Sequence, residues 1–208
     1  MRGGGILSIG GPVSDIELPN PRPLADDEAL IAVRAAGVGN WDEVVRQGGW
    51  DVGIAPPMAL GVEAAGVVTA VGAAVHDWAP GDEVLTHPLP LRTGGTWAPQ
   101  LIAPAALLAR KPAAMSWAAA AALPVPALTA EQALSEAVEI KAGETLLIDG
   151  GGGVTGRPAR RPRGSARGTG HSHSELDEPH EAAATGRRAR GRLPRSGVGR
   201  CSRGHSRH

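Results

Sequence analysis

Leu146-Leu147-Ile148-Asp149-Gly150-Gly151-Gly152-Gly153-Val154-Thr155-Gly156 is an apolar run that leads into a glycine-rich turn. The glycines at 151, 153 and 156 have the G-x-G-x-x-G spacing, which lets a backbone approach a pyrophosphate where a helix begins. We therefore predict a strand over 145–149 and a cofactor site at Gly151, Gly153, Val154 and Gly156. The next residues are Arg157-Pro158-Ala159-Arg160-Arg161-Pro162. Their two prolines disfavour the helix that should complete the site.

The composition of the chain changes after this turn. Residues 1–156 hold 8 Lys+Arg against 17 Asp+Glu, a net charge of −9, and all five tryptophans. Residues 157–208 hold 13 arginines, no lysine and 4 acidic residues, a net charge of +9. Only Leu176, Leu193 and Val198 are large aliphatic residues there. Because so little apolar surface can be buried, we predict a disordered arginine-rich tail over 157–208.

The composition also limits the class of protein. A single cysteine, Cys201, excludes an internal disulfide and a multi-cysteine zinc site. No apolar run approaches the roughly 20 residues of a membrane-spanning helix, and the first residues do not form a signal peptide. We therefore expect a cytoplasmic protein that does not interact with a membrane.

Before residue 115 the sequence predicts many short strands. Strands are expected over 30–38 and 62–71, with a turn entering a third within 80–85 and the start of a fourth within 95–102. Short strands separated by glycine and proline are typical of a β-barrel or sandwich. Helices are then expected over 117–122, with Ser116 as N-cap, and over 130–138, with Thr129 as N-cap.

Several motifs follow one another in an order typical of one family. They are Gly10-Gly11-Pro12, Ala35-Ala36-Gly37-Val38 with Asp42, Leu60-Gly61-Val62-Glu63-Ala64-Ala65-Gly66-Val67-Val68, Pro80-Gly81-Asp82-Glu83-Val84, Ala121-Ala122-Leu123-Pro124, Leu128-Thr129-Ala130 and the glycine turn. In this order, residues 1–156 resemble the N-terminal half of a medium-chain dehydrogenase/reductase, nearest to the zinc-independent quinone oxidoreductase branch. The resemblance implies a mainly β fold with an α/β remainder. A GroES-like β-barrel would cover 1–115. A helical link, with the first strand and glycine loop of a truncated Rossmann domain, would cover 116–156.

The resemblance also implies an activity and a set of site residues. It implies NADPH as cofactor, a small quinone or enone as substrate, and a homodimer for the intact family form. Asp42 and Asn40 would lie on the substrate side, although the family's asparagine sits one place earlier, at Gly39. Asp42 could equally cap a helix over 43–47. Thr129 would approach the nicotinamide amide. Glu63 is expected to be a buried hydrogen-bonding group rather than an acid catalyst.

Two departures from the zinc-dependent members of the family concern metal binding. Those enzymes have Gly-His-Glu where this chain has Gly61-Val62-Glu63, and a cysteine where it has Gly39-Asn40. Valine offers no lone pair, and a catalytic zinc needs three protein ligands with nitrogen, sulfur or oxygen donors. We therefore predict no metal site.

The tail supports a hypothesis of its own. If its codons are read one base later, with serine written as AGY, His171 to Glu175 become Ile/Thr, Val/Ala, Ile/Thr, Val/Ala and Asn/Ser, an alternation typical of a second Rossmann strand. We therefore predict that residues 157–208 are out of frame relative to the family's Rossmann domain, so that the chain is inactive. The shifted reading contains no Asp or Glu at these positions to bind the NAD ribose, which favours NADP(H). The alternative is a non-enzymatic barrel remnant whose basic tail binds polyanions, although a tail without lysine or aromatic residues is a poor nucleic-acid ligand.

Overall fold

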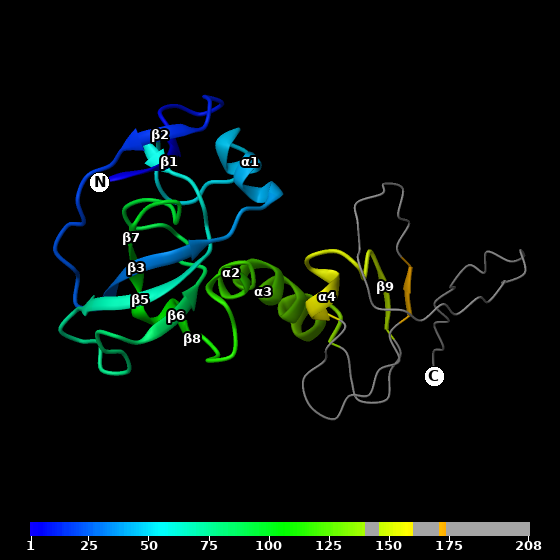
Figure 1. Cartoon of the computed structure of the whole chain (residues 1–208). Coiled ribbons are helices and arrows are strands. Elements are labelled where there is room, and N and C mark those ends of the chain that lie inside the picture. Colours follow the sequence, from blue (N-terminus) through cyan, green and yellow to red (C-terminus); the bar gives the residue numbers. More distant parts are fainter. Residues whose placement is uncertain (140–145, 160–170, 174–208) are drawn as a thin grey trace, which may run out of the picture. The chain divides into compact units, whose positions relative to one another are not determined.

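Two antiparallel sheets make up the first part of the chain in the computed structural model, which describes residues 1–139, 146–159 and 171–173. The larger sheet has the order β7-β3-β5-β6-β8 (Figure 1). Its strands are β3 (Glu28–Ala36), β5 (Ala64–Val71), β6 (Glu83–Thr86), β7 (Gln100–Pro104) and β8 (Leu108–Arg110). The smaller sheet has the order β2-β1-β4, with β1 (Arg2–Ile6), β2 (Ser14–Glu17) and β4 (Met58–Ala59).

The apolar residues of these strands form separate buried clusters. Alternate positions of β3, β5, β6 and β7 supply one cluster, as expected when successive side chains point to opposite faces of a sheet; its buried members are Ala29, Ile31, Val68, Val84, Leu101 and Ala103. A second cluster lies beside the smaller sheet and contains Ile6, Val45, Val52, Met58, Leu60, Val62 and Leu91. Asn40, Asp42 and Glu63 border this second cluster.

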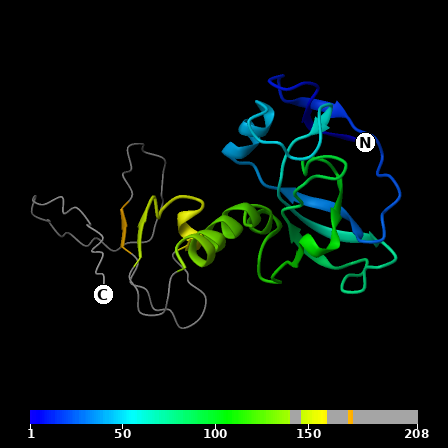
Figure 2. The same cartoon turned by 180° about the vertical axis from the view of Figure 1, so that it is seen from behind.

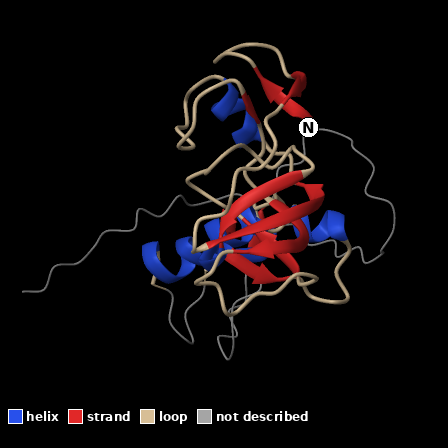
Figure 3. Ribbon diagram, turned by 90° about the vertical axis from the view of Figure 1, so that its left-hand side faces the viewer, coloured by secondary structure: helices blue, strands red, loops and turns tan. Residues whose placement is uncertain are grey.

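The mainly β class is confirmed, but the strands differ in detail from the expectation. The four predicted strands correspond to β3, β5, β6 and β7. Among the described residues the two sheets are not joined into one closed barrel. The two-residue β4 and the three-residue β8 were missed because strands so short carry no periodicity. Figure 3 shows the strands of the larger sheet stacked side by side.

The helices after residue 115 confirm one predicted N-cap and contradict the other. Helix α2 (Trp117–Ala121) begins after Ser116, whose hydroxyl accepts a hydrogen bond from the Ala119 N–H at 3.2 Å. Helix α3 (Pro124–Gln132) begins earlier than predicted and continues into a π-helical turn, η2 (Ala133–Ala137). Thr129 therefore lies inside α3, and its prediction as an N-cap was wrong. Pro124 occupies the first helical position, where proline is favoured because no intrahelical N–H is needed there.

The remaining described elements follow the glycine turn. They are β9 (Leu147–Asp149), the four-residue helix α4 (Gly156–Ala159) and β10 (His171–His173), which pairs with β9 in parallel (Figure 2). β9 confirms the predicted strand over residues 147–149, whereas residue 145 lies outside the described residues. Pro158 lies within α4, in a first turn where its missing N–H costs no bond. Most of the predicted disordered tail lies outside the described residues. Within the described ranges, no helix has the length and hydrophobicity needed to cross a membrane.

Candidate functional site

Asp42 is buried in the third position of helix α1 (Asn40–Arg46). Its Oδ2 accepts a hydrogen bond from the Gly39 N–H at 2.8 Å, which is the side-chain half of a capping box. The predicted alternative, that Asp42 caps this helix, is therefore correct, although the helix begins at Asn40. The other oxygen, Oδ1, has no hydrogen-bond partner. Burial raises the pKa of Asp42, and the N–H groups of Gly39 and Gly61 oppose this effect.

The neighbours of Asp42 on α1 differ from it in exposure. Asn40 is the first residue of the helix, and it is exposed. Trp41 is half-buried against the second cluster, and its indole Nε1 is buried without a hydrogen-bond partner. A substrate could therefore meet the Asn40 amide directly, whereas Asp42 is only 3% exposed.

Glu63 is the second buried carboxyl group in this region, and its side chain reaches α3. It is 2% exposed, and its Oε2 accepts a hydrogen bond from the Val125 N–H at 2.8 Å. Burial raises the pKa of Glu63 to about 7, the Val125 N–H lowers it, and the charge of Asp42 raises it further. Glu63 is thus buried and hydrogen-bonded, as predicted.

The position where zinc-dependent relatives have histidine is apolar and buried here. Val62 is 1% exposed and belongs to the second cluster. Its backbone oxygen lies 2.7 Å from His87 Nδ1, and the His87 ring centroid lies 6.3 Å from that of Trp50. His87 is half-buried, and its partner Val62 lies 25 residues earlier in the chain.

The glycine turn brings backbone segments of its own residues close together. The Gly153 N–H donates to the Gly150 oxygen at 2.9 Å, and Gly150 has a positive φ of 68°. A Cβ at Gly156 would overlap the Gly150 oxygen and come within 2.7 Å of the Gly151 Cα, so only glycine lets α4 begin this close to β9. Val154 is 64% exposed at the tip of the turn.

Thr129 is exposed on α3, and its hydroxyl donates to the Val125 oxygen at 2.8 Å. A hollow of about 500 Å³ separates α3 and η2 from β9 and the glycine turn. Its lining is mostly apolar and includes Ala130, Ala133, Leu134, Leu147, Val154 and Gly156. The structure thus groups the candidates in two places. Asp42, Asn40 and Glu63 lie beside the second cluster, and the glycine turn lies across this hollow from α3.

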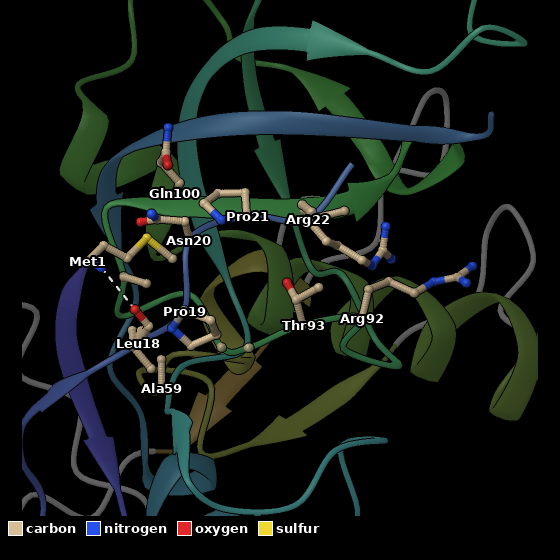
Figure 4. Close-up of a pocket in the computed structure, with 14 residues that line it drawn as sticks. Met1, Leu18, Pro19, Asn20, Pro21, Arg22, Ala59, Arg92, Thr93 and Gln100 are labelled. Carbon is tan, nitrogen blue, oxygen red and sulfur yellow. Dashed lines mark hydrogen bonds between the residues drawn. The ribbon is translucent and has the colours of Figure 1, made fainter. Parts of the chain in front are cut away.

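Another hollow, of about 330 Å³, contains none of the predicted site residues (Figure 4). Arg22 and Arg92 line it, but each forms an ion pair with an acidic residue. Arg22 makes two hydrogen bonds to the Glu28 carboxylate, at 2.7 and 2.8 Å, and Arg92 lies 3.8 Å from Asp27. Both arginines of this hollow are therefore already paired with carboxylates.

Comparison with known proteins places this geometry in a family. The alcohol dehydrogenase GroES-like domain matches residues 25–113. The pikromycin polyketide synthase component PikAII of Streptomyces venezuelae is 35% identical over 156 residues, 75% of this chain and 4% of that protein. A quinone oxidoreductase from Pongo abelii is 32% identical over 164 residues, 76% of this chain and 48% of that protein.

The chain belongs to the medium-chain dehydrogenase/reductase superfamily. Among solved structures, mycobacterial Rv1454c complexed with NADPH matches with a TM-score of 0.65 and 30% identity, over 76% of this chain and 48% of that chain. The chain therefore spans about half the length of the quinone oxidoreductases that it matches. The resemblance to this superfamily indicated by the sequence motifs is confirmed, including the GroES-like domain.

Proposed function

We propose that this chain is the GroES-like part of a zinc-independent, NADPH-dependent reductase of quinones or activated enones, and that the 208-residue chain itself is inactive. The observation that carries the proposal is the order of elements. A GroES-like fold is followed by α2 and α3, then by β9, a glycine turn and the start of α4. Val62 supports the zinc-independent assignment, because an apolar side chain stands where a metal ligand would be required.

The residues present fit part of an NADPH site. The glycine turn brings the start of α4 against the end of β9. Gly156 permits this close approach, because a Cβ at this position would occupy the space between the two segments. Gly151, Gly153, Val154 and Gly156 would hold the pyrophosphate, and the exposed Thr129 hydroxyl would meet the nicotinamide amide. When bound, the nicotinamide supplies a hydride to the quinone ring or to the β-carbon of an enone. The NADPH complex of the mycobacterial relative supports this choice of cofactor.

On the substrate side, Asn40 and Asp42 have different proposed roles. The exposed Asn40 amide can donate a hydrogen bond to a carbonyl oxygen of the substrate. The buried Asp42 holds the first turn of α1 through Gly39 and thereby orients Asn40. A homodimer of the intact form and a cytoplasmic location complete the proposal.

Two versions of the protein test it. The first is the 208-residue chain, and the second has the reading frame shifted by one base within the codons for Thr155 to Pro158. NADPH binding is measured by nicotinamide fluorescence, and turnover is measured with a benzoquinone and with an enone. We expect binding and turnover only in the frame-shifted version, unaffected by EDTA. Loss of turnover in EDTA would contradict the zinc-independent assignment, and no binding by either version would favour the barrel remnant.

A further inference from the structure

The first turn of α3 has an unusual set of hydrogen-bond donors. Its first three residues are Pro124, Val125 and Pro126, and proline has no N–H. The residue before them, Leu123, has no side-chain acceptor and makes no side-chain cap. From Ala127 onward the helix supplies its own acceptors, since the Ala127 N–H donates to the Leu123 oxygen at 2.9 Å. Val125 therefore has the single N–H among these three residues, and it needs an acceptor from outside the helix.

Glu63 provides this acceptor from a fixed position. Its Oε2 lies 2.8 Å from the Val125 nitrogen although the two residues are 62 positions apart. The carboxyl group lies so close to Gly37 that a Cβ there would overlap it. The backbone oxygen of Glu63 accepts hydrogen bonds from the Thr96 hydroxyl at 2.9 Å and from the Gly37 N–H at 3.0 Å. Glu63 is thus held by its main chain and by its side chain.

Side-chain packing also holds the start of α3 on one side. The Val125 side chain packs against the second cluster. On another side, a hollow of about 330 Å³ lies between the start of α3 and the strands β6 and β8; it is lined by Leu85, Thr86, Leu108, Leu123, Pro124 and Leu128. Helix α2, in contrast, buries Ala120 and Ala121 against Ala65 of β5. Pro124 and Pro126 in the first turn of α3 are also buried, and the hydrogen bond to Glu63 adds a directional contact to this packing.

The structure assigns to Glu63 the role of a positioning residue, whose carboxyl group anchors the first turn of α3 and fixes the direction in which this helix leaves the sheet. Thr129 lies one turn beyond Val125, and its hydroxyl bonds the Val125 oxygen. An anchored Val125 therefore also places Thr129. This consequence for cofactor binding rests on the proposed function, whereas the anchor itself does not.

The charge state of Glu63 should change the strength of its hydrogen bond to the Val125 N–H. Asp42, from α1, is the charged group that acts on it, and it favours the neutral form. Glu43 and Arg46 on the same helix pair with each other at 2.6 Å. His87 contacts the neighbouring Val62 oxygen, and Glu131 lies further along α3. Because a bond from an N–H to an ionised carboxylate is stronger than one to a neutral acid, the Val125 bond should strengthen as pH rises through about 7.

The test is a ¹H–¹⁵N NMR pH titration with amide hydrogen exchange on the full 208-residue chain. Glu63→Gln keeps an acceptor oxygen and removes the charge, whereas Glu63→Leu removes the acceptor. Glu28→Gln is the matched control, because Glu28 is also a buried carboxyl group but bonds Arg22 and the Ala25 N–H instead. In the unsubstituted chain the Val125 amide proton should move downfield with a midpoint near pH 7, as it should in Glu28→Gln.

In Glu63→Gln the titration should vanish while Val125 remains protected. In Glu63→Leu its exchange should accelerate roughly 10-fold or more, the factor expected for loss of a hydrogen bond to a charged group. A folded Glu63→Leu variant with unchanged Val125 exchange would overturn the proposal, as would a Val125 titration that persists in Glu63→Gln. If Glu63→Leu does not fold, the Val125 titration in Glu63→Gln, compared with that in the unsubstituted chain, tests the proposal by itself.

Discussion

Replacing Glu63 with glutamine should change how the stability of the protein depends on pH. Burial raises the pKa of Glu63 from 4.5 to about 7, and the side chain is 2% exposed. Between these two pH values the folded state binds a proton that the unfolded state releases. The stabilisation from this group is therefore fully present below pH 4.5 and is lost as pH rises through about 7.

The size of this effect follows from the difference between the two pKa values. One pKa unit corresponds to about 1.4 kcal/mol, so the free energy of unfolding should fall by up to about 3 kcal/mol between pH 4.5 and pH 8 because of Glu63. The Val125 hydrogen bond strengthens over the same range, but it recovers only part of the cost of burying the charge. Glutamine resembles the neutral acid, so the Glu63→Gln variant should lack this decrease.

The assay is urea denaturation at several pH values from 4.5 to 8, followed by tryptophan fluorescence. All five tryptophans lie in residues 1–156, so the signal reports on this part of the chain. The difference in unfolding free energy between Glu63→Gln and the unsubstituted chain should grow in favour of the variant as pH rises. Two curves that run parallel over this range would refute the reasoning, because Glu63 would then titrate alike in the folded and unfolded states.

Three further substitutions test other contacts. Arg22 lowers the pKa of Glu28 to about 2, so this pair stabilises the fold above pH 4.5 and the effect is lost as pH falls toward 2. Since Arg22 is 42% exposed, solvent screening reduces the loss in Glu28→Gln to about 1–2 kcal/mol at pH 6, measured by urea denaturation, and the curves should converge near pH 2. Ser116→Ala should cost about 1 kcal/mol through the lost N-cap, whereas the exposed, mid-helix Ser135→Ala should change stability little; thermal unfolding distinguishes them. Gly37→Ala should destabilise by about 1–3 kcal/mol because its methyl group overlaps the Glu63 carboxyl, and Gly94→Ala, which meets open space, is its control. Equal stabilities for the two alanine variants would contradict the close approach at Gly37.

Features that depend on neighbouring residues could be predicted from the sequence. Ser116 precedes an alanine-rich segment and caps it, and the glycine spacing after Asp149 gives a turn. The short helix α4 that follows was not expected, because Pro158 and Pro162 were predicted to disfavour it. The start of α3 was missed because Thr129 was predicted as the N-cap, whereas the helix begins at Pro124, where a first turn tolerates proline. A turn can be predicted from the residues within it, whereas the hydrogen-bond partner of a distant side chain cannot.

The partners of Glu63 illustrate this limit. Its burial could be inferred from the apolar residues around it, but Val125 lies 62 positions away and offers only a backbone N–H. No side-chain pattern in the sequence marks such a donor. The same holds for His87, whose partner is the backbone oxygen of Val62. Both contacts depend on the arrangement of the sheets, which the sequence specifies only through the whole fold.

The electrostatics beside Val62 connect the anchor with the proposed chemistry. Asp42 and Glu63 are both buried, and their pKa values are shifted by burial and by backbone N–H groups. The charge of Asp42 also raises the pKa of Glu63, and no cationic side chain among the described residues acts on either group. A metal ion there would favour ionised carboxylates, but the apolar Val62 side chain cannot act as a ligand. Under these conditions the protein lowers the cost of burying two carboxyl groups in one region by keeping Glu63 largely protonated below about pH 7. Glu63 can then hold α3 without the full cost of a buried charge. The substitution of an apolar residue for a metal ligand and the use of Glu63 as an anchor are thus physically consistent with each other.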